Sequence, residues 1–280
     1  MRKRLIAAVT AVAVLGLGVG VAFAENIYEV HIASTSKGKG SLAKPRPVKL
    51  NFGYTVGDTE NQRPTVVKQY RIAPEAHVTY PKAFPTCTFE QADRRPSIHR
   101  ACRKAIVGGG LVRNNAGGAT DRTQKLVCNL KLTLINISTG DRSDRPTLRQ
   151  IRKEGGMAIR LDGEPPAAAD PVNGVGCTLP IHEALAAPFY DIRLNGLPSS
   201  ELRFTVPQEL TEPLPGVNNA VIEARSVVRK RVARARVRGK MRRVGYYSKI
   251  ACRKTGITRV QFVDEQGTRF TARKRVPGRC

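Results

Sequence analysis

Few residues with catalytic potential stand at a spacing that supports catalysis. His182 and Glu183 begin the HExxH pattern of zinc proteases, but Ala186 stands where the second histidine is needed. Without two histidines one helical turn apart, this pattern cannot hold a zinc ion. No GxSxG turn, which would present a nucleophilic serine, occurs in the chain.

Two carboxylate pairs are close in sequence, Asp162 with Glu164 and Asp141 with Asp144. Both lie in Gly-, Ser- or Pro-containing stretches, where acidic residues ordinarily serve turn geometry. We therefore expect no enzyme activity, no cofactor and no metal site. The rival interpretation is a secreted hydrolase acting on the cell wall, with a site assembled from distant strands.

The segment RKRVARARVRGKMRR, residues 229–243, holds the densest cluster of basic residues. Alternation predicts a strand with Arg234, Arg236 and Arg238 on one face, a turn at residues 238–240, and a returning strand. Closely spaced guanidinium groups on a rigid sheet would bind phosphate or carboxylate groups well. The candidate anion-binding residues are Arg229, Arg231, Arg234, Arg236, Arg238, Arg242 and Arg243. Alternatively, the charges only keep an exposed strand soluble and prevent edge pairing.

The whole chain is basic, with a formal net charge of +26 over 280 residues. Such an excess indicates an anionic partner, unless a GC-rich genome simply places Arg at polar surface positions. Nucleic acid is not the expected partner, because no zinc finger, recognition helix or stacking motif beyond Tyr246-Tyr247 is present. An anionic cell-wall polymer or anionic lipid head groups fit better.

The N-terminus has the pattern of a secretory signal peptide. Residues 2–4 are basic, residues 5–21 are apolar, and Ala22-Phe23-Ala24 matches a cleavage site. We expect residues 1–24 to be removed, although retention as an anchor is the alternative. The protein is then secreted or held in the cell envelope, with no transmembrane span after cleavage.

Six cysteines follow in the predicted exported part: Cys87, Cys102, Cys128, Cys177, Cys252 and Cys280. An even number in an oxidising compartment predicts disulfides. Because Cys87 and Cys102 flank a short connection and Cys280 ends the chain, we expect sequential pairing, although spacing alone leaves other pairings open. No CxxC spacing indicates a metal site.

Short alternating segments separated by Pro- and Gly-rich turns recur along residues 25–280. They predict an all-β protein, an antiparallel β-sandwich of the immunoglobulin-like type, in a single disulfide-linked domain. One short helix is expected near 96–107, with Ser97 as N-cap and Gly108 as its end. The glycines at 108–110 and 117–118 are expected to form a helix stop and a turn.

Three features together resemble a known group: the signal peptide, the segment FPTCTFEQADRRPSIHRACRKAIVGGG, and the basic hairpin leading to YYSKIACRK and a C-terminal Cys. They resemble uncharacterised secreted β-rich proteins of high-GC soil actinobacteria. The resemblance covers the layout of most of the mature chain, and the pair Cys128 and Cys177 departs from it. It implies export and a sandwich-like fold, and no activity.

The sequence therefore predicts an exported, non-catalytic protein associated with the envelope. It would bind an anionic polymer through the Arg-rich hairpin. A structural module with no specific ligand is the second rival to this interpretation.

Overall fold

The computed structural model of the protein describes residues 26–35, 39–139, 146–163, 181–251 and 255–277. The predicted signal peptide, residues 1–24, lies outside them. Within these ranges, the structure has no helix of the length and apolar character that a membrane crossing requires.

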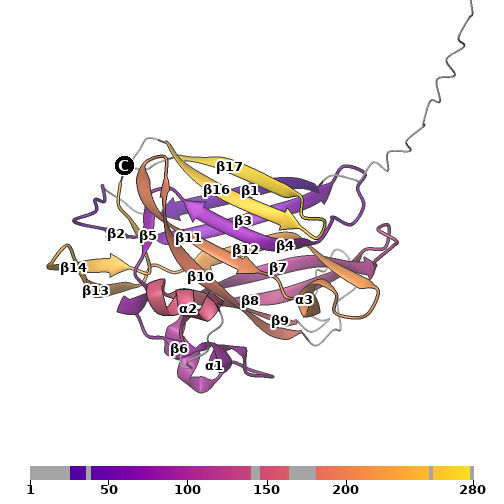
Figure 1. Ribbon diagram of the computed structural model, residues 1–280, viewed down its shortest axis with the longest axis horizontal. Coiled ribbons are helices and arrows are strands. Elements are labelled where there is room, and N and C mark those ends of the chain that lie inside the picture. The colour runs from indigo at the N-terminus through magenta and orange to yellow at the C-terminus, as the bar shows by residue number, and fades with distance from the viewer. Residues whose placement is uncertain (1–25, 36–38, 140–145, 164–180, 252–254, 278–280) are drawn as a thin grey trace, which may run out of the picture.

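One large sheet dominates the fold (Figure 1). Its main path runs in the order β1 (Asn26–Thr35), β3 (Lys49–Asp58), β12 (Val217–Val228), β7 (Ile106–Gly118), β8 (Leu126–Ser138), β9 (Gly156–Gly163), β10 (His182–Leu194), β11 (Leu197–Thr205), β4 (Val67–Pro74), β16 (Thr255–Asp264) and β17 (Arg269–Pro277). All neighbours on this path are antiparallel, and the short β6 (Cys87–Thr88) adds to β8 in parallel.

The large sheet curves until its two outer strands meet. Strands β1 and β17 lie side by side in Figure 1, and the ring of Tyr28 stacks on that of Phe270 with centroids 4.7 Å apart. The all-β class is therefore confirmed. The immunoglobulin-like sandwich is not confirmed, because the large sheet has a barrel-like shape.

Strand β10 changes partner halfway along its length. Residues 182–188 pair with β9, and residues 189–194 pair with β11. The change falls at Pro188, which has no N–H to donate to a further ladder. Along residues 182–188, β10 therefore pairs with a described strand on one side only.

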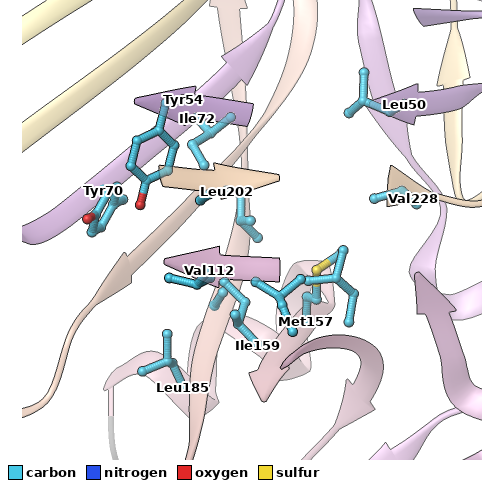
Figure 2. Close-up of a cluster of buried hydrophobic side chains, with 14 of the residues drawn as sticks. Leu50, Tyr54, Tyr70, Ile72, Val112, Met157, Ile159, Leu185, Leu202 and Val228 are labelled. Atoms are coloured by element: carbon cyan, nitrogen blue, oxygen red, sulfur yellow. The ribbon is translucent and has the colours of Figure 1, made fainter. Parts of the chain in front are cut away.

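Alternate side chains of the large sheet fill the interior, as Figure 2 shows. On β8 the predicted alternation is confirmed for Leu130, Leu132 and Leu134, which are buried, whereas Leu126 is exposed. Alternation of this kind drives folding because each inward apolar side chain is removed from water.

Two small sheets lie beside the large one. The first is a hairpin of β13 (Val232–Val237) and β14 (Lys240–Gly245), and the second joins β2 (Arg46–Pro47), β15 (Tyr247–Lys249) and β5 (His77–Thr79). In Figure 1 the hairpin projects from one end of the molecule.

The helical segments differ from the expectation of one helix. There are three α-helices, α1 (Phe89–Asp93), α2 (Pro146–Glu154) and α3 (Gln208–Thr211), among the described residues, and two 3-10 segments, η1 (Pro81–Ala83) and η2 (Arg100–Ala105). The expected helix near 96–107 is only η2, capped by His99 rather than Ser97. It ends early because Ile106 already pairs with Ile135 of β8. Strand pairing thus overrides the helical spacing of its apolar residues.

The glycines at 108–110 and 117–118 are strand residues, and the predicted helix stop and turn are wrong. All five lie in β7. A Cβ at Gly108 would collide with the carbonyl oxygen of Val227, and one at Gly110 with that of Arg225. Glycine is required here because the backbone of β12 approaches β7 this closely.

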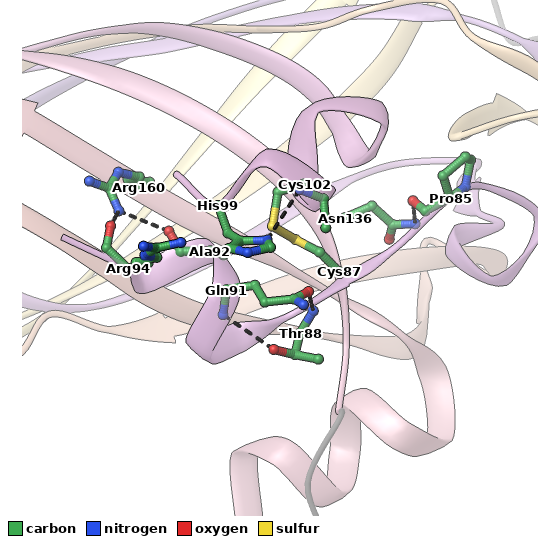
Figure 3. Close-up of a disulfide and its surroundings, with 11 residues drawn as sticks. Pro85, Cys87, Thr88, Gln91, Ala92, Arg94, His99, Cys102, Asn136 and Arg160 are labelled. Atoms are coloured by element: carbon green, nitrogen blue, oxygen red, sulfur yellow. Dashed lines mark hydrogen bonds between the residues drawn. A yellow bond between two sulfur atoms is a disulfide. The ribbon is translucent and has the colours of Figure 1, made fainter. Parts of the chain in front are cut away.

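The disulfide between Cys87 and Cys102 is confirmed, with Cα atoms 5.1 Å apart. It ties β6 to η2, next to a capping box in which Thr88 and Gln91 bond reciprocally at the start of α1 (Figure 3). Cys128 is also disulfide-bonded. Cys177, Cys252 and Cys280 lie outside the described residues, so the rest of the expected pairing stays a prediction.

Candidate anion-binding site

The basic segment forms the hairpin that its sequence predicts. Its strands β13 and β14 are joined by Arg238 and Gly239, whose φ angles are +48° and +78°. Two successive left-handed residues are typical of the tightest hairpin turns. Arg238 is therefore part of the turn, and its expected place on the strand face beside Arg234 and Arg236 is wrong.

The two faces of the hairpin differ in exposure. On the inner face Val237 and Val244 are buried, which anchors the strands on the body of the protein. On the outer face Arg234 pairs across the strands with Arg243, and Arg236 pairs with Met241. All four of these outer residues are exposed. Like charges directly opposite each other destabilise a strand pair, and an anion would relieve that repulsion.

Arg231 anchors the hairpin rather than offering its charge to a ligand. Its Nη1 donates to the carbonyl oxygens of Lys104 at 2.8 Å and Ile106 at 3.0 Å. The backbone N–H of Arg229 donates to the carbonyl of Val107 at 2.9 Å. These bonds fix the start of the hairpin to the junction of η2 and β7, so its position is set by the large sheet.

A groove of about 570 Å³ lies between the hairpin and the loop that leads into β2. We call it the basic groove. Its walls are formed by Lys39, Lys44, Pro45, Arg46, Pro47, Lys230, Val232, Met241, Arg242 and Arg243. Six of these ten side chains are cationic and none is acidic.

The six cations of the basic groove have no anionic partner among the described residues. None of their side chains forms an ion pair or a hydrogen bond there. The Nε of Arg242 is buried and has no hydrogen-bond partner within the described ranges. A guanidinium N–H removed from water without an acceptor is unfavourable, and a bound anion would supply one.

The structure brings together only part of the predicted residue set. Arg242 and Arg243 line the basic groove, Arg234 and Arg236 extend the face that carries Arg243, and Arg231 is occupied in holding the hairpin. Sequence reasoning missed Lys39, Lys44 and Arg46 on the opposite wall. Their signal was the density of Lys and Arg at positions 37–46 of the sequence.

Two of the residues considered for catalysis, Asp162 and His182, belong to a cluster of contacts around Arg160. The fully buried Arg160 donates through Nε to both carboxylate oxygens of Asp162, and Asp162 also contacts Nδ1 of His182 at 3.0 Å. Further bonds from the Arg160 guanidinium reach the carbonyl oxygens of Ala92, Arg94 and Pro96, as Figure 3 shows in part. This cluster holds the segment after α1 against β9. Glu164, Asp141 and Asp144 lie outside the described residues.

Among the residues that the structure describes, no group of three His, Cys, Asp or Glu side chains is placed to hold a metal ion. Comparison of the chain with known protein families, curated proteins and solved structures finds no significant match.

Proposed function

We propose that this protein is an exported, non-catalytic protein of the cell envelope that binds an anionic polymer in the basic groove. The observation that carries the proposal is the convergence of six cationic side chains on one groove without a described anionic partner. Charges held close together by a fixed backbone attract a polyanion more strongly than the same charges spread over the surface.

Shape favours an extended ligand over a small ion. The lining of the basic groove includes Arg243 from the outer face of the hairpin, where Arg234 and Arg236 continue the row of charges. Val232 and Met241 stand within this row and are 43% and 59% exposed. Exposed apolar side chains between cations suit a polymer that alternates anionic groups with apolar faces, such as sugar rings or short alkyl spacers.

The test measures binding of the purified protein to purified cell walls, to duplex DNA and to vesicles of an anionic lipid across a salt series. Binding through charge neutralisation weakens as salt rises, with a slope set by the number of contacts. We expect cell walls to retain the protein at a salt concentration where DNA and vesicles release it. Release from all three at the same salt would show charge attraction without a specific site.

Two variants with the same net charge distinguish the contribution of the basic groove to binding from that of the overall charge. The groove variant combines Lys44→Ser, Arg46→Ser and Arg243→Ser, which are exposed positions from both walls. The control variant combines Arg269→Ser, Arg273→Ser and Arg275→Ser, exposed positions on β17.

Both variants lower the net charge by three, but only the groove variant should weaken wall binding strongly. If its three side chains each neutralise one anionic group, the logarithmic salt slope should fall by roughly two to three. Equal weakening by the two variants would contradict a binding site at the groove.

A further inference from the structure

A cavity of about 110 Å³ lies inside the large sheet. Its walls are almost entirely apolar, and Figure 2 shows several of the side chains that converge on it, including Leu50, Val112 and Ile159. The lining extends from Asn219 near α3 to Tyr247 at the other end of the strands. Because its volume is small and its lining is long, the cavity is narrow.

Two asparagine side chains at one end of the cavity carry amide oxygens that have no hydrogen-bond partner among the described residues. Asn219 donates through Nδ2 to the carbonyl oxygen of Leu210 at 2.9 Å, which fixes its orientation and leaves Oδ1 without a partner in the described part of the chain. The Oδ1 of Asn114 is also buried and has no described partner. The two side chains are 4% and 3% exposed. Buried polar atoms normally have a hydrogen-bond partner. Two acceptors at one place without a described partner therefore favour a ligand that has a hydrogen-bond donor.

Strand register explains why the two asparagines lie together. Asn114 of β7 pairs with Val221 of β12, and Asn219 pairs with Ala116. The two residues are therefore diagonal neighbours on the inner face of one strand pair. Both belong to the lining of the cavity.

The cavity adjoins a cleft on the outside of the sheet. The cleft has a volume of about 610 Å³, and Tyr70, Leu185 and Phe204 line both spaces. Among the described strands, residues 182–188 of β10 pair here only with β9, and residues 203–205 of β11 pair only with β4. The wall between cavity and cleft is closed by side chains rather than by a strand ladder, so rotation of those side chains can open it.

We propose that the cavity binds a small uncharged aliphatic alcohol that enters through this cleft. The hydroxyl donates to the Oδ1 atoms of Asn114 and Asn219, and the alkyl group occupies the apolar remainder. An apolar cavity of about 150 Å³ accepts benzene, so a space of this size holds roughly four or five carbon atoms. A carboxylate or ammonium group is excluded, because no described ion of opposite charge lines the cavity and a buried unpaired charge is strongly unfavourable.

The test uses three probes of similar length with the unmodified protein. Saturation-transfer NMR titrations compare 1-butanol with methyl propyl ether, an isomer of equal heavy-atom count that cannot donate a hydrogen bond, and with butanoate. We expect 1-butanol to bind about tenfold more tightly than the ether, and butanoate not to bind. Equal affinity for alcohol and ether would refute the role of the asparagines, and no binding of either would overturn the proposal.

A matched pair of variants localises the effect. Asn114→Leu removes one of the two Oδ1 atoms, whereas Asn115→Leu changes the neighbouring asparagine, which is also buried but does not line the cavity. The preference for alcohol over ether should shrink in the first variant and persist in the second. A preference that persists in both variants would place the alcohol elsewhere.

Discussion

Protonation of His77 should control how the stability of this protein changes with pH. His77 begins β5 and is buried, with Nδ1 2.7 Å from the carbonyl oxygen of Glu75 and Nε2 2.9 Å from Oγ of Ser34. A carbonyl can only accept, so Nδ1 carries the proton and Nε2 accepts from the serine hydroxyl. The neutral ring thus satisfies both neighbours.

Burial lowers the pKa of His77 from 6.5 to about 4. The positive charge of Lys249, which pairs with His77 across β5 and β15, lowers the pKa further, and the bond to the Glu75 carbonyl opposes the shift. A difference of roughly 2.5 pH units corresponds to about 3 kcal/mol, at about 1.36 kcal/mol per unit.

The sign of the pH dependence follows from which state, folded or unfolded, binds the proton at the higher pH. Between pH 6.5 and 4 the unfolded chain is protonated at this histidine and the folded chain is not, so acid favours unfolding. The contribution of His77 is therefore fully present above pH 6.5. It is lost progressively as the pH falls toward 4.

Urea unfolding between pH 4 and pH 8 measures this contribution. The free energy of unfolding of the variant His77→Gln should depend less on pH between 6.5 and 4, by up to about 3 kcal/mol over the interval. His31→Gln is the control, because it removes a histidine whose side chain is 55% exposed. If the unmodified protein and His77→Gln lose stability in parallel over this interval, the assignment to His77 is wrong.

Three further variants test the packing of the fold by urea unfolding at neutral pH. Gly110→Ala should destabilise by several kcal/mol, since its Cβ would collide with the Arg225 carbonyl; a change below about 1 kcal/mol would contradict this close approach. Replacing Cys87 and Cys102 by Ser should cost about 3 kcal/mol for the short loop they close, and unchanged stability would show that the bond does not restrict the unfolded chain. Arg160→Met should cost about 3 kcal/mol, because Asp162 and three backbone carbonyl oxygens lose the buried guanidinium that bonds to them, whereas a neutral result would mean that water replaces the guanidinium.

Alternation along single strands was readable from the sequence. Leu50, Phe52 and Tyr54 stand at alternate positions in the sequence of β3, and all three line the inner cavity. This succeeded because a strand buried on one side repeats every two residues regardless of its neighbours. The hairpin of β13 and β14 was predictable for the same reason.

Features that depend on neighbouring strands could not be predicted from the sequence. The glycines of β7 resemble a turn until the approach of β12 is known, and that approach is a property of the folded sheet. Closure of the sheet by β1 and β17 left no local signal, so a sandwich was the natural expectation. The opposite wall of the basic groove was missed because Lys44 and Arg46 are far in sequence from Arg243.

The meeting of β1 with β17 has a consequence for how the chain reaches its native state. Strand β4 lacks its partner β16, and β1 lacks its neighbour β17, until residues 255–277 have joined the large sheet. Contacts of such long range form slowly. Until then the apolar interior faces water along two open edges, and a chain in that condition is prone to aggregate. A chain lacking residues 255–277 should therefore aggregate on refolding at a concentration at which the chain that contains them refolds.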